Sequence, residues 1–270
     1  MGGKTRGIRE ALLACAEAAC EAAAPPAVAA VYLPEPCPNP ARDAEFGAVM
    51  LEDGSAGLYY AWLGPDQQGM AEKFPAATLV GMPALALAAR YLDDDIATRS
   101  LALAAINALT SWAWRRQGHV PPAATDSLCG VALSPGETVG FIGNFPPLVR
   151  RLREQGHPVR VVERKAHMLQ EAPGLVITLD PAVLVDCPVV FGTAAMLLND
   201  SLDDMLPWCR SAREIALLGP TAGCFPEPLF ARGITRIGGL QLLDAATAIQ
   251  RMREDGKWQA DCARRFLLEA

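Results

Sequence analysis

The sequence lacks several features that would direct it to a membrane or to nucleic acid. It contains no run of about 18 uninterrupted apolar residues, the minimum for a membrane-crossing helix. It has no basic cluster, and its formal net charge of −6 repels both nucleic acid and anionic lipid. Charged side chains interrupt its first 26 residues, unlike a secretory signal peptide. We therefore expect a cytoplasmic protein with no nucleic-acid or membrane partner.

Common catalytic and metal-binding motifs are also missing. The sequence has no Gly-x-Ser-x-Gly elbow, no Gly-Lys-Ser/Thr phosphate loop and no Gly-x-Gly-x-x-Gly fingerprint. It has no Cys-x-x-Cys pair, and its three histidines fall in predicted loops and turns. The cysteines are scattered, at positions 15, 20, 37, 129, 187, 209, 224 and 262. This spacing indicates neither a zinc site nor a small disulfide scaffold.

The chain does have enough apolar residues for a substantial core. With 270 residues and 51% hydrophobic content, it is long enough for one large domain or two ordinary ones. Its first part predicts a helix ending near residue 24, a strand at 27–33 and a β-hairpin at 45–64 that turns at Asp53-Gly54. Helices follow at 83–92 and 95–114, the second beginning at Asp95 as its N-cap.

Asn107 lies close to the apolar face of the second helix, which Ile96, Leu103 and Ile106 define. The amide is therefore expected to point inward. It could bond a neighbouring backbone group or contact a ligand, and both interpretations stay open.

Residues 116–128 are polar and rich in proline and glycine, which predicts a linker. After them, short apolar strands alternate with amphipathic helices, the pattern of a parallel sheet covered on both faces. Predicted helices include 146–156 and one beginning at Ser201, where Ser201 and Asp204 have the spacing of a capping box. Cys209 falls on the apolar side of that helix and is expected in the core.

Ligands of open parallel sheets bind beyond the carboxyl ends of the strands. The residues in that position are Gly143, Asn144, Phe145, Glu163, Asp180, Thr193 to Asp200, Gly219 to Thr221, and Gly238-Gly239. Glu163 ends a strand about 20 residues after a glycine turn, where dinucleotide-binding proteins hold a ribose hydroxyl. Pro146 and Pro147, however, remove two N–H donors that a pyrophosphate would need, which argues against a classical NAD-type site.

Cys224 is the best single candidate for thiol or metal chemistry, because it follows a predicted strand within a loop rich in glycine and proline. A structural thiol is the favoured interpretation of this residue.

Four segments together resemble the heavy-metal chelation family of bacteria and archaea, whose function is uncharacterised. They are ALAAINAL (102–109), VGFIGNFPPLVRRLREQG (139–156), VVFGTAAMLLNDSLDDML (189–206) and ALLGPTAGCFPEPLFARGIT (216–235). The resemblance implies an α/β protein with an enolase-N-terminal-like α+β domain, residues 1–120, and a Rossmann-like parallel-sheet domain, residues 121–270. It also implies a site in the cleft between the two domains.

By this resemblance, the turn from Gly143 through Asn144 and Phe145 to Pro146 matches the family's Gly-x-Phe-Pro turn. Other matching positions are Glu163, Asn199, and the Pro220-Thr221 turn that follows Gly219. Thr193 aligns with the start of the family's Thr-rich loop, although Ala194, Ala195 and Met196 then replace its hydroxyls.

These observations predict a small-molecule or metal-complex binding protein that acts in heavy-metal chelation or homeostasis. The expected ligand contacts are Asn107, Gly143, Asn144, Phe145, Pro146, Glu163, Thr193, Asn199, Gly219, Pro220 and Thr221. The cofactor considered is a metal ion or a metal chelate. Three alternative functions stay open: direct metal binding through cysteines, a transferase that uses S-adenosylmethionine or a similar nucleotide-like cofactor, and a scaffold with a vestigial site. The protein could also form a homo-oligomer.

Overall fold

The computed structural model describes residues 7–34, 46–61, 69–254 and 257–270. Cys37 lies outside these ranges. The first part of the chain forms α1 (Ile8–Ala22), β1 (Val28–Tyr32), β2 (Phe46–Leu51), β3 (Ala56–Tyr60), α2 (Met70–Lys73), α3 (Ala76–Leu79), α4 (Ala84–Ala89), the 3-10 turn η2 (Arg90–Leu92) and α5 (Ile96–Arg116).

The second part begins with β4 (Val139–Ile142), α6 (Pro146–Glu154), β5 (Val159–Val162), η3 (Ala166–Met168), β6 (Gln170–Ala172), β7 (Leu175–Thr178), η4 (Pro181–Leu184), β8 (Val189–Thr193) and η5 (Ala194–Leu197). It continues with α7 (Leu202–Met205), η6 (Leu206–Cys209), β9 (Glu214–Leu218), η7 (Pro220–Ala222), α8 (Glu227–Phe230), β10 (Arg236–Leu242), α9 (Ala245–Arg253), α10 (Gln259–Cys262) and β11 (Ala263–Glu269).

The first three strands form a small antiparallel sheet in the order β1-β2-β3. The predicted hairpin is confirmed: Gly54 takes a positive φ of 82° in its turn, and the Asp53 carboxylate accepts the Ser55 N–H at 2.9 Å. The predicted start of α5 is also confirmed, because the Asp95 carboxylate accepts the Thr98 N–H at 2.7 Å. Both features follow from local turn and cap chemistry.

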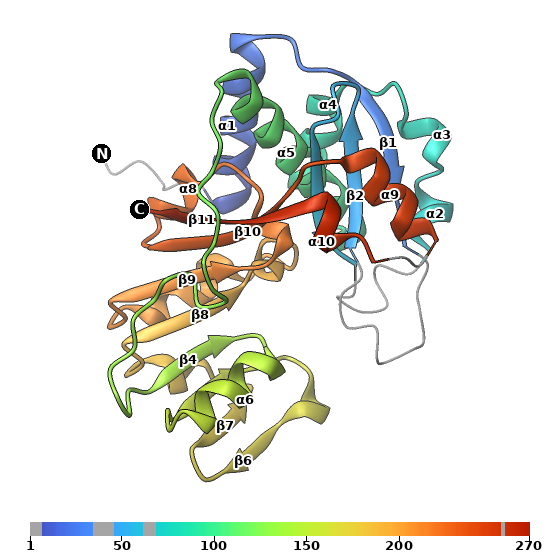
Figure 1. Cartoon of the computed structure of the whole chain (residues 1–270). Helices are drawn as coiled ribbons and strands as arrows, with labels where there is room; N and C mark the ends of the chain where they lie inside the picture. The colour runs from blue at the N-terminus through green and yellow to red at the C-terminus, as the bar shows by residue number, and fades with distance from the viewer. Residues whose placement is uncertain (1–6, 35–45, 62–68, 255–256) are drawn as a thin grey trace, which may run out of the picture.

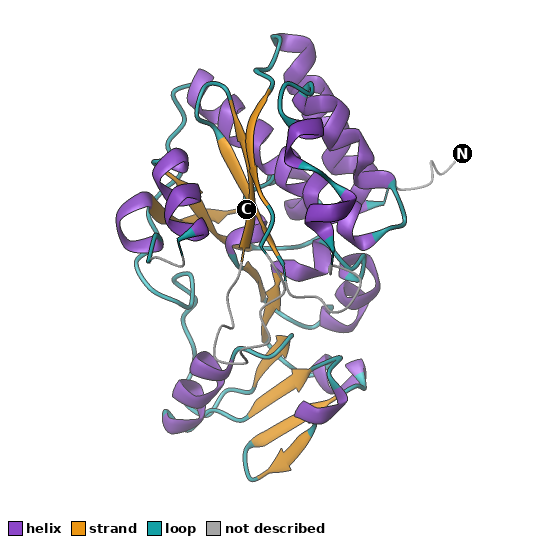
Figure 2. Cartoon of the chain, turned by 90° about the vertical axis from the view of Figure 1, so that its right-hand side faces the viewer, coloured by secondary structure: helices purple, strands orange, loops and turns teal. Residues whose placement is uncertain are grey.

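Helix α5 is buried on all sides, as its apolar composition requires. Strand β3 lies directly on it at Gly57, where an added Cβ would come within 2.2 Å of the Ala104 carbonyl oxygen. Helices α1 and α4 pack against α5, while α9 covers the opposite face of the small sheet. Figure 2 shows these strands between helices on both sides.

The larger sheet has eight strands in the order β11-β10-β9-β8-β4-β5-β7-β6. Strands β4, β5, β7, β8, β9 and β10 are parallel, and the edge strands β6 and β11 are antiparallel to their neighbours. The predicted mixed α/β architecture, with a small antiparallel sheet and a larger mostly parallel one, is thus confirmed (Figure 1).

Both faces of the larger sheet are covered, one by α6 with residues 128–133 and the other by a layer that includes α1 and α5.

The helices that connect the parallel strands of this sheet are shorter than the sequence pattern suggests. Among the described connections between its parallel strands, α6 alone exceeds four residues; the others are 3-10 turns and single helical turns. Prolines occupy one of the first two positions of many of these turns, for example Pro181, Pro207, Pro220 and Pro228, where a missing N–H donor breaks no helical hydrogen bond.

The expected capping box at Ser201 is wrong. The Ser201 hydroxyl donates to the Asn199 side-chain oxygen at 2.6 Å, and the α-helix runs only from Leu202 to Met205. Asp203 instead bonds the first turn of α1, where its carboxylate accepts the Ile8 N–H at 2.9 Å. Cys209 is fully buried, as predicted.

Residues from both parts of the chain share one core. The cluster that contains Leu101 and Leu103 of α5 also contains Val190 and Leu217 of the larger sheet. The boundary near residue 120 remains a prediction. Within the described ranges, none of the helices combines the length and apolar character needed to span a membrane.

The segment after α5 is attached to the edge of the larger sheet. Ala123 forms an antiparallel bridge with Phe266 of β11. The Leu267 N–H donates to the Pro122 carbonyl at 2.9 Å, and the Ala124 N–H donates to the Arg265 carbonyl at 3.1 Å. The linker therefore forms part of the fold at these three residues.

Candidate functional site

The strand order reverses between β4 and β8. Numbered along the chain, the six parallel strands have the order 3-2-1-4-5-6, and sheets of this order bind ligands beyond the carboxyl ends at the point of reversal. Gly143 follows β4 with a φ of 85°, and a Cβ there would lie 2.8 Å from Thr193 Cγ2 at the end of β8. The sequence-predicted residues Gly143 and Thr193 are therefore side by side at this point.

Glu163 and Asn144 also meet at this edge. The Asn144 N–H donates to Glu163 Oε2 at 3.0 Å, and the Lys165 N–H donates to Glu163 Oε1 at 3.0 Å. These bonds hold the carboxylate beside the glycine turn. The Asn144 side-chain oxygen is buried with no hydrogen-bond partner, while its nitrogen lies 4.0 Å from Met168 Sδ. A buried amide oxygen without a donor is a position where a ligand donor gains the most.

The next two predicted residues start α6. Phe145 is its N-cap residue and packs its ring against Phe141, with the ring centroids 5.9 Å apart. Pro146 and Pro147 occupy the first positions of the helix, so two of its free N–H donors are missing. The structure thus places a carboxylate at the β5 end but a poor phosphate cradle at the β4 end.

Asn107, Thr221 and their neighbours form a second group. Asn107 Nδ2 donates to the Leu58 carbonyl at 2.8 Å and to the Thr221 carbonyl at 3.0 Å. Thr221 Oγ1 accepts the Tyr60 N–H at 3.0 Å. Asn107 therefore bonds backbone carbonyls through its nitrogen, as one of the two sequence interpretations proposed. These contacts join α5 and β3 to the turn after β9.

The two groups lie along the same edge of the sheet. Gly219, which precedes Pro220 and Thr221, adjoins Ala194 of the loop after β8: a Cβ on Gly219 would lie 3.6 Å from the Ala194 Cβ. Ala194 follows Thr193 directly, so the loop after β8 connects the two groups.

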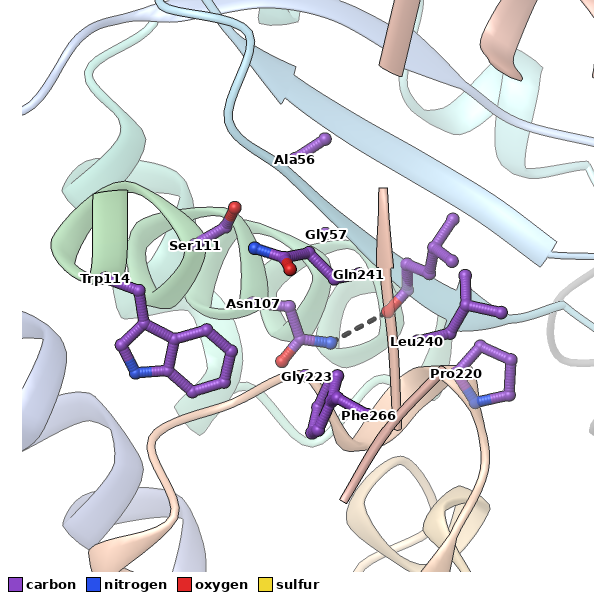
Figure 3. Close-up of a pocket in the computed structure, with 11 residues that line it drawn as sticks. Ala56, Gly57, Asn107, Ser111, Trp114, Pro220, Gly223, Leu240, Gln241 and Phe266 are labelled. Carbon is purple, nitrogen blue, oxygen red and sulfur yellow. Dashed lines mark hydrogen bonds between the residues drawn. The ribbon is translucent and has the colours of Figure 1, made fainter. Parts of the chain in front are cut away.

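A small pocket lies beside Asn107 (Figure 3). Its lining residues are Ala56, Gly57, Leu58, Asn107, Ser111, Trp114, Pro220, Gly223, Leu240, Gln241 and Phe266. The free volume of about 10 Å³ accommodates about one water molecule. Asn107 Oδ1 is buried there without a protein partner, and Arg264 holds Gln241 by a 2.9 Å bond to its side-chain oxygen. The sequence did not indicate Gln241 as a pocket residue, because its position depends on the pairing of β10 with β11, which brings Arg264 beside it.

Asn199 lies at the other end of the loop after β8. Its side-chain oxygen accepts the N–H and the hydroxyl of Ser201, so it fixes that turn. The preceding residue, Leu198, accepts a 3.0 Å bond from Arg99 Nε of α5. Arg99 is 8% exposed and forms no ion pair within the described residues. The sequence did carry a signal for Arg99, which is three residues after Ile96 and four before Leu103 on the apolar face.

Direct metal chemistry has little support in this geometry. Across the residues that the structure describes, no three His, Cys, Asp or Glu side chains gather as they would around a metal ion. Cys224 is fully buried, and burial raises the pKa of its thiol to about 12. A thiol with this pKa is not a thiolate at neutral pH, so a structural role for Cys224 is favoured.

Comparison with known proteins is consistent with this fold. Two family models, DUF364 and DUF4213, both described as "putative heavy-metal chelation", match residues 127–263 and 44–110 respectively. An uncharacterized protein of Methanocaldococcus jannaschii is 30% identical over 156 residues, which cover 57% of this chain and 59% of that protein. The match thus spans less than two thirds of this relative.

Two crystal structures of DUF364 proteins with unknown function share the fold. The protein from Pyrococcus horikoshii has a TM-score of 0.70 and 18% identity, and covers 97% of this chain and 100% of its own. The protein from Desulfitobacterium hafniense has a TM-score of 0.66 and 20% identity, with coverages of 97% and 99%. The extent of the family match, together with this shared fold, places the chain in the DUF364 family.

Proposed function

We propose that the protein binds a small polar molecule or a metal complex at the carboxyl ends of β4 and β5 and serves in the handling of a heavy metal. The observation that carries this proposal is the buried, unpartnered side-chain oxygen of Asn144 beside the Glu163 carboxylate. Both groups accept hydrogen bonds, so they suit a ligand that presents hydroxyl or amino donors, or a bound cation.

A metal complex fits better than a bare heavy-metal ion. The described residues offer no cluster of three metal ligands, and five of the cysteines are buried. Soft heavy metals prefer thiolate ligands. A metal that arrives within an organic chelate brings its own ligands and needs only recognition by hydrogen bonds. The description of the family supports a connection with heavy metals.

Calorimetric titration tests the proposal. The full chain is titrated with Ni²⁺, Co²⁺, Cu²⁺ and Zn²⁺, each alone and as its citrate and histidine complexes. We expect a complex to bind more tightly than its free ion. Loss of a hydrogen bond to a charged group costs about 1.5–3 kcal/mol, so Glu163→Gln should weaken that binding by about tenfold or more.

The matched control is Glu171→Gln, which changes an exposed carboxylate on β6 of the same sheet. Asn144→Ala should weaken binding as Glu163→Gln does, whereas the control should bind like the wild type. Equal binding by all four proteins would remove the proposed site.

A further inference from the structure

The chemistry of the β5 end narrows the ligand class. In sheets with the order 3-2-1-4-5-6, an acidic residue at the end of the second strand binds ribose hydroxyls. Strand β5 is the second strand, and Glu163 follows its last residue directly. Its N–H donates to the Thr178 carbonyl of β7 at 2.9 Å, so the residue is fixed to the sheet.

The Glu163 carboxylate is both oriented and available. Each of its oxygens accepts one backbone N–H, from Asn144 and from Lys165. A carboxylate oxygen has a second lone-pair site, so each can accept one more donor. A pair of neighbouring hydroxyls can therefore bind both oxygens without any rearrangement of the side chain, which reduces the entropic cost of binding.

The glycine turn disfavours a phosphate next to this diol. Pro146 and Pro147 remove the first two N–H donors of α6, and Asn144 offers an unpartnered oxygen, which is an acceptor. Phosphate oxygens are acceptors too, so they would meet no helix N–H donor at Pro146 and Pro147 and would face the acceptor oxygen of Asn144. A hydroxyl or amino group at the same place would bond the Asn144 oxygen.

Apolar side chains are exposed beside the end of β7. Leu179 follows Thr178, the residue that bonds Glu163, and is 55% exposed. Leu169 precedes the paired strand β6 and is 42% exposed. These exposed leucine side chains, near the strand ends that flank Glu163, offer apolar contact area to the base of a nucleoside.

We infer that this site binds a phosphate-free nucleoside group, with its ribose diol on Glu163 and its base against Leu169 and Leu179. The inference rests on the proposed function because it uses the same edge of the sheet, and it specifies the organic part of the ligand. Adenosine and S-adenosylmethionine are ligands of this class.

A set of related nucleosides tests the inference by calorimetry on the full chain. Adenosine, S-adenosylmethionine, 2′,3′-dideoxyadenosine, AMP and NAD are compared. Adenosine or S-adenosylmethionine should bind about tenfold or more tightly than 2′,3′-dideoxyadenosine, which lacks the diol, because charged-group hydrogen bonds contribute this much. This comparison needs no variant, so it does not depend on mutant folding.

Phosphate should add no affinity. AMP and NAD are expected to bind more weakly than adenosine, although Arg164 and Lys165 are exposed just after Glu163. Glu163→Gln should abolish the preference for the diol, and Glu171→Gln should retain it. Absence of nucleoside binding, equal binding of the dideoxy analogue, or tighter binding of AMP would each overturn the inference.

The outcome is separable from that of the proposed function. If metal complexes bind through Asn144 and Glu163 but nucleosides do not, the nucleoside inference alone fails. If nucleosides bind with the expected preference and no metal complex binds, the metal role alone fails.

Discussion

At the residue scale, Asn107 connects three segments that are far apart in sequence. Its side-chain nitrogen bonds the Leu58 carbonyl of β3 and the Thr221 carbonyl of η7. Asn107→Ala leaves both buried carbonyls without this donor, so we expect the free energy of unfolding to fall by about 2–4 kcal/mol. Denaturant unfolding measures the change. Ser111→Ala, one turn later and also buried, is the control and should cost less than about 1 kcal/mol.

Gly57 sets the distance between β3 and α5. A Cβ at this position would lie 2.2 Å from the Ala104 carbonyl oxygen and 2.5 Å from the Ala108 nitrogen, both backbone atoms. Gly57→Ala must therefore displace the helix, and we expect a loss of about 3 kcal/mol or more in denaturant unfolding.

The control for Gly57→Ala is Gly223→Ala in the same pocket. A Cβ there would lie 3.6 Å from the nearest atom, the Asn107 Cβ, at an ordinary contact distance. The two variants should differ clearly in stability. Similar stabilities would show that the close approach of β3 to α5 has no energetic consequence.

Cys224 should be unreactive in the folded protein. It is fully buried, and burial raises the pKa of its thiol to about 12, so thiolate is scarce at about pH 7.5. Treatment with a maleimide followed by peptide mass spectrometry should label Cys20, which is partly exposed on α1, well before Cys224. Rapid labelling of Cys224 under native conditions would contradict its placement in the core.

At the scale of elements, α5 depends on its N-cap. Burial alone would raise the pKa of Asp95, but hydrogen bonds from Lys73 and Thr98 outweigh it and hold the pKa below its ordinary value of 3.8. A depressed carboxyl pKa stabilises the fold above the unfolded-state value, and this contribution is lost as the pH falls through the folded-state pKa.

Asp95→Asn removes the charge but keeps a good N-cap residue. We expect the wild type to have the higher Tm at about pH 6, and the difference to shrink as the pH falls through the folded-state pKa of Asp95, which lies below 3.8. Thermal unfolding followed by circular dichroism measures both values. A difference that stays constant with pH would show that the ionised carboxylate contributes nothing.

The elements that sequence predicted are those with strong local signals. The hairpin at Asp53-Gly54, the cap at Asp95 and the parallel strands each follow from a few neighbouring residues. Strands β6 and β11 were missed, because their pairing depends on distant partners rather than on apolar alternation. The capping box at Ser201 was wrong because Asn199 competes for the Ser201 hydroxyl and Pro207 interrupts the helix.

At the scale of the whole molecule, the two sheets share one core. Tyr91 of the first part donates to the Leu197 carbonyl at 2.6 Å, and Asn107 needs the Thr221 carbonyl. We therefore expect a fragment of residues 1–120 to remain unfolded, whereas the full chain unfolds in one cooperative transition. Circular dichroism and calorimetry test the two expectations. A well-folded fragment would instead support an independent first domain.

Each candidate site residue could be predicted to follow a particular strand, but the sequence alone could not predict which of these residues lie next to one another. Sequence places Asn144, Glu163 and Thr193 after strands, but the strand order determines that they share the edge where the order reverses. Asn199 also follows a strand, yet its side chain fixes a turn. No local pattern distinguishes these cases, because each depends on the path of the chain between strands.

The attachment of residues 122–124 to β11 has a kinetic consequence. The attachment removes residues 122–124 from any hinge, and the core shared by the two parts of the chain opposes a swing about the residues before them. Ligand entry is therefore expected to proceed without domain opening, through local side-chain movement alone. Association should then be a single concentration-dependent step in stopped-flow experiments, with no slow phase that reports a preceding rearrangement.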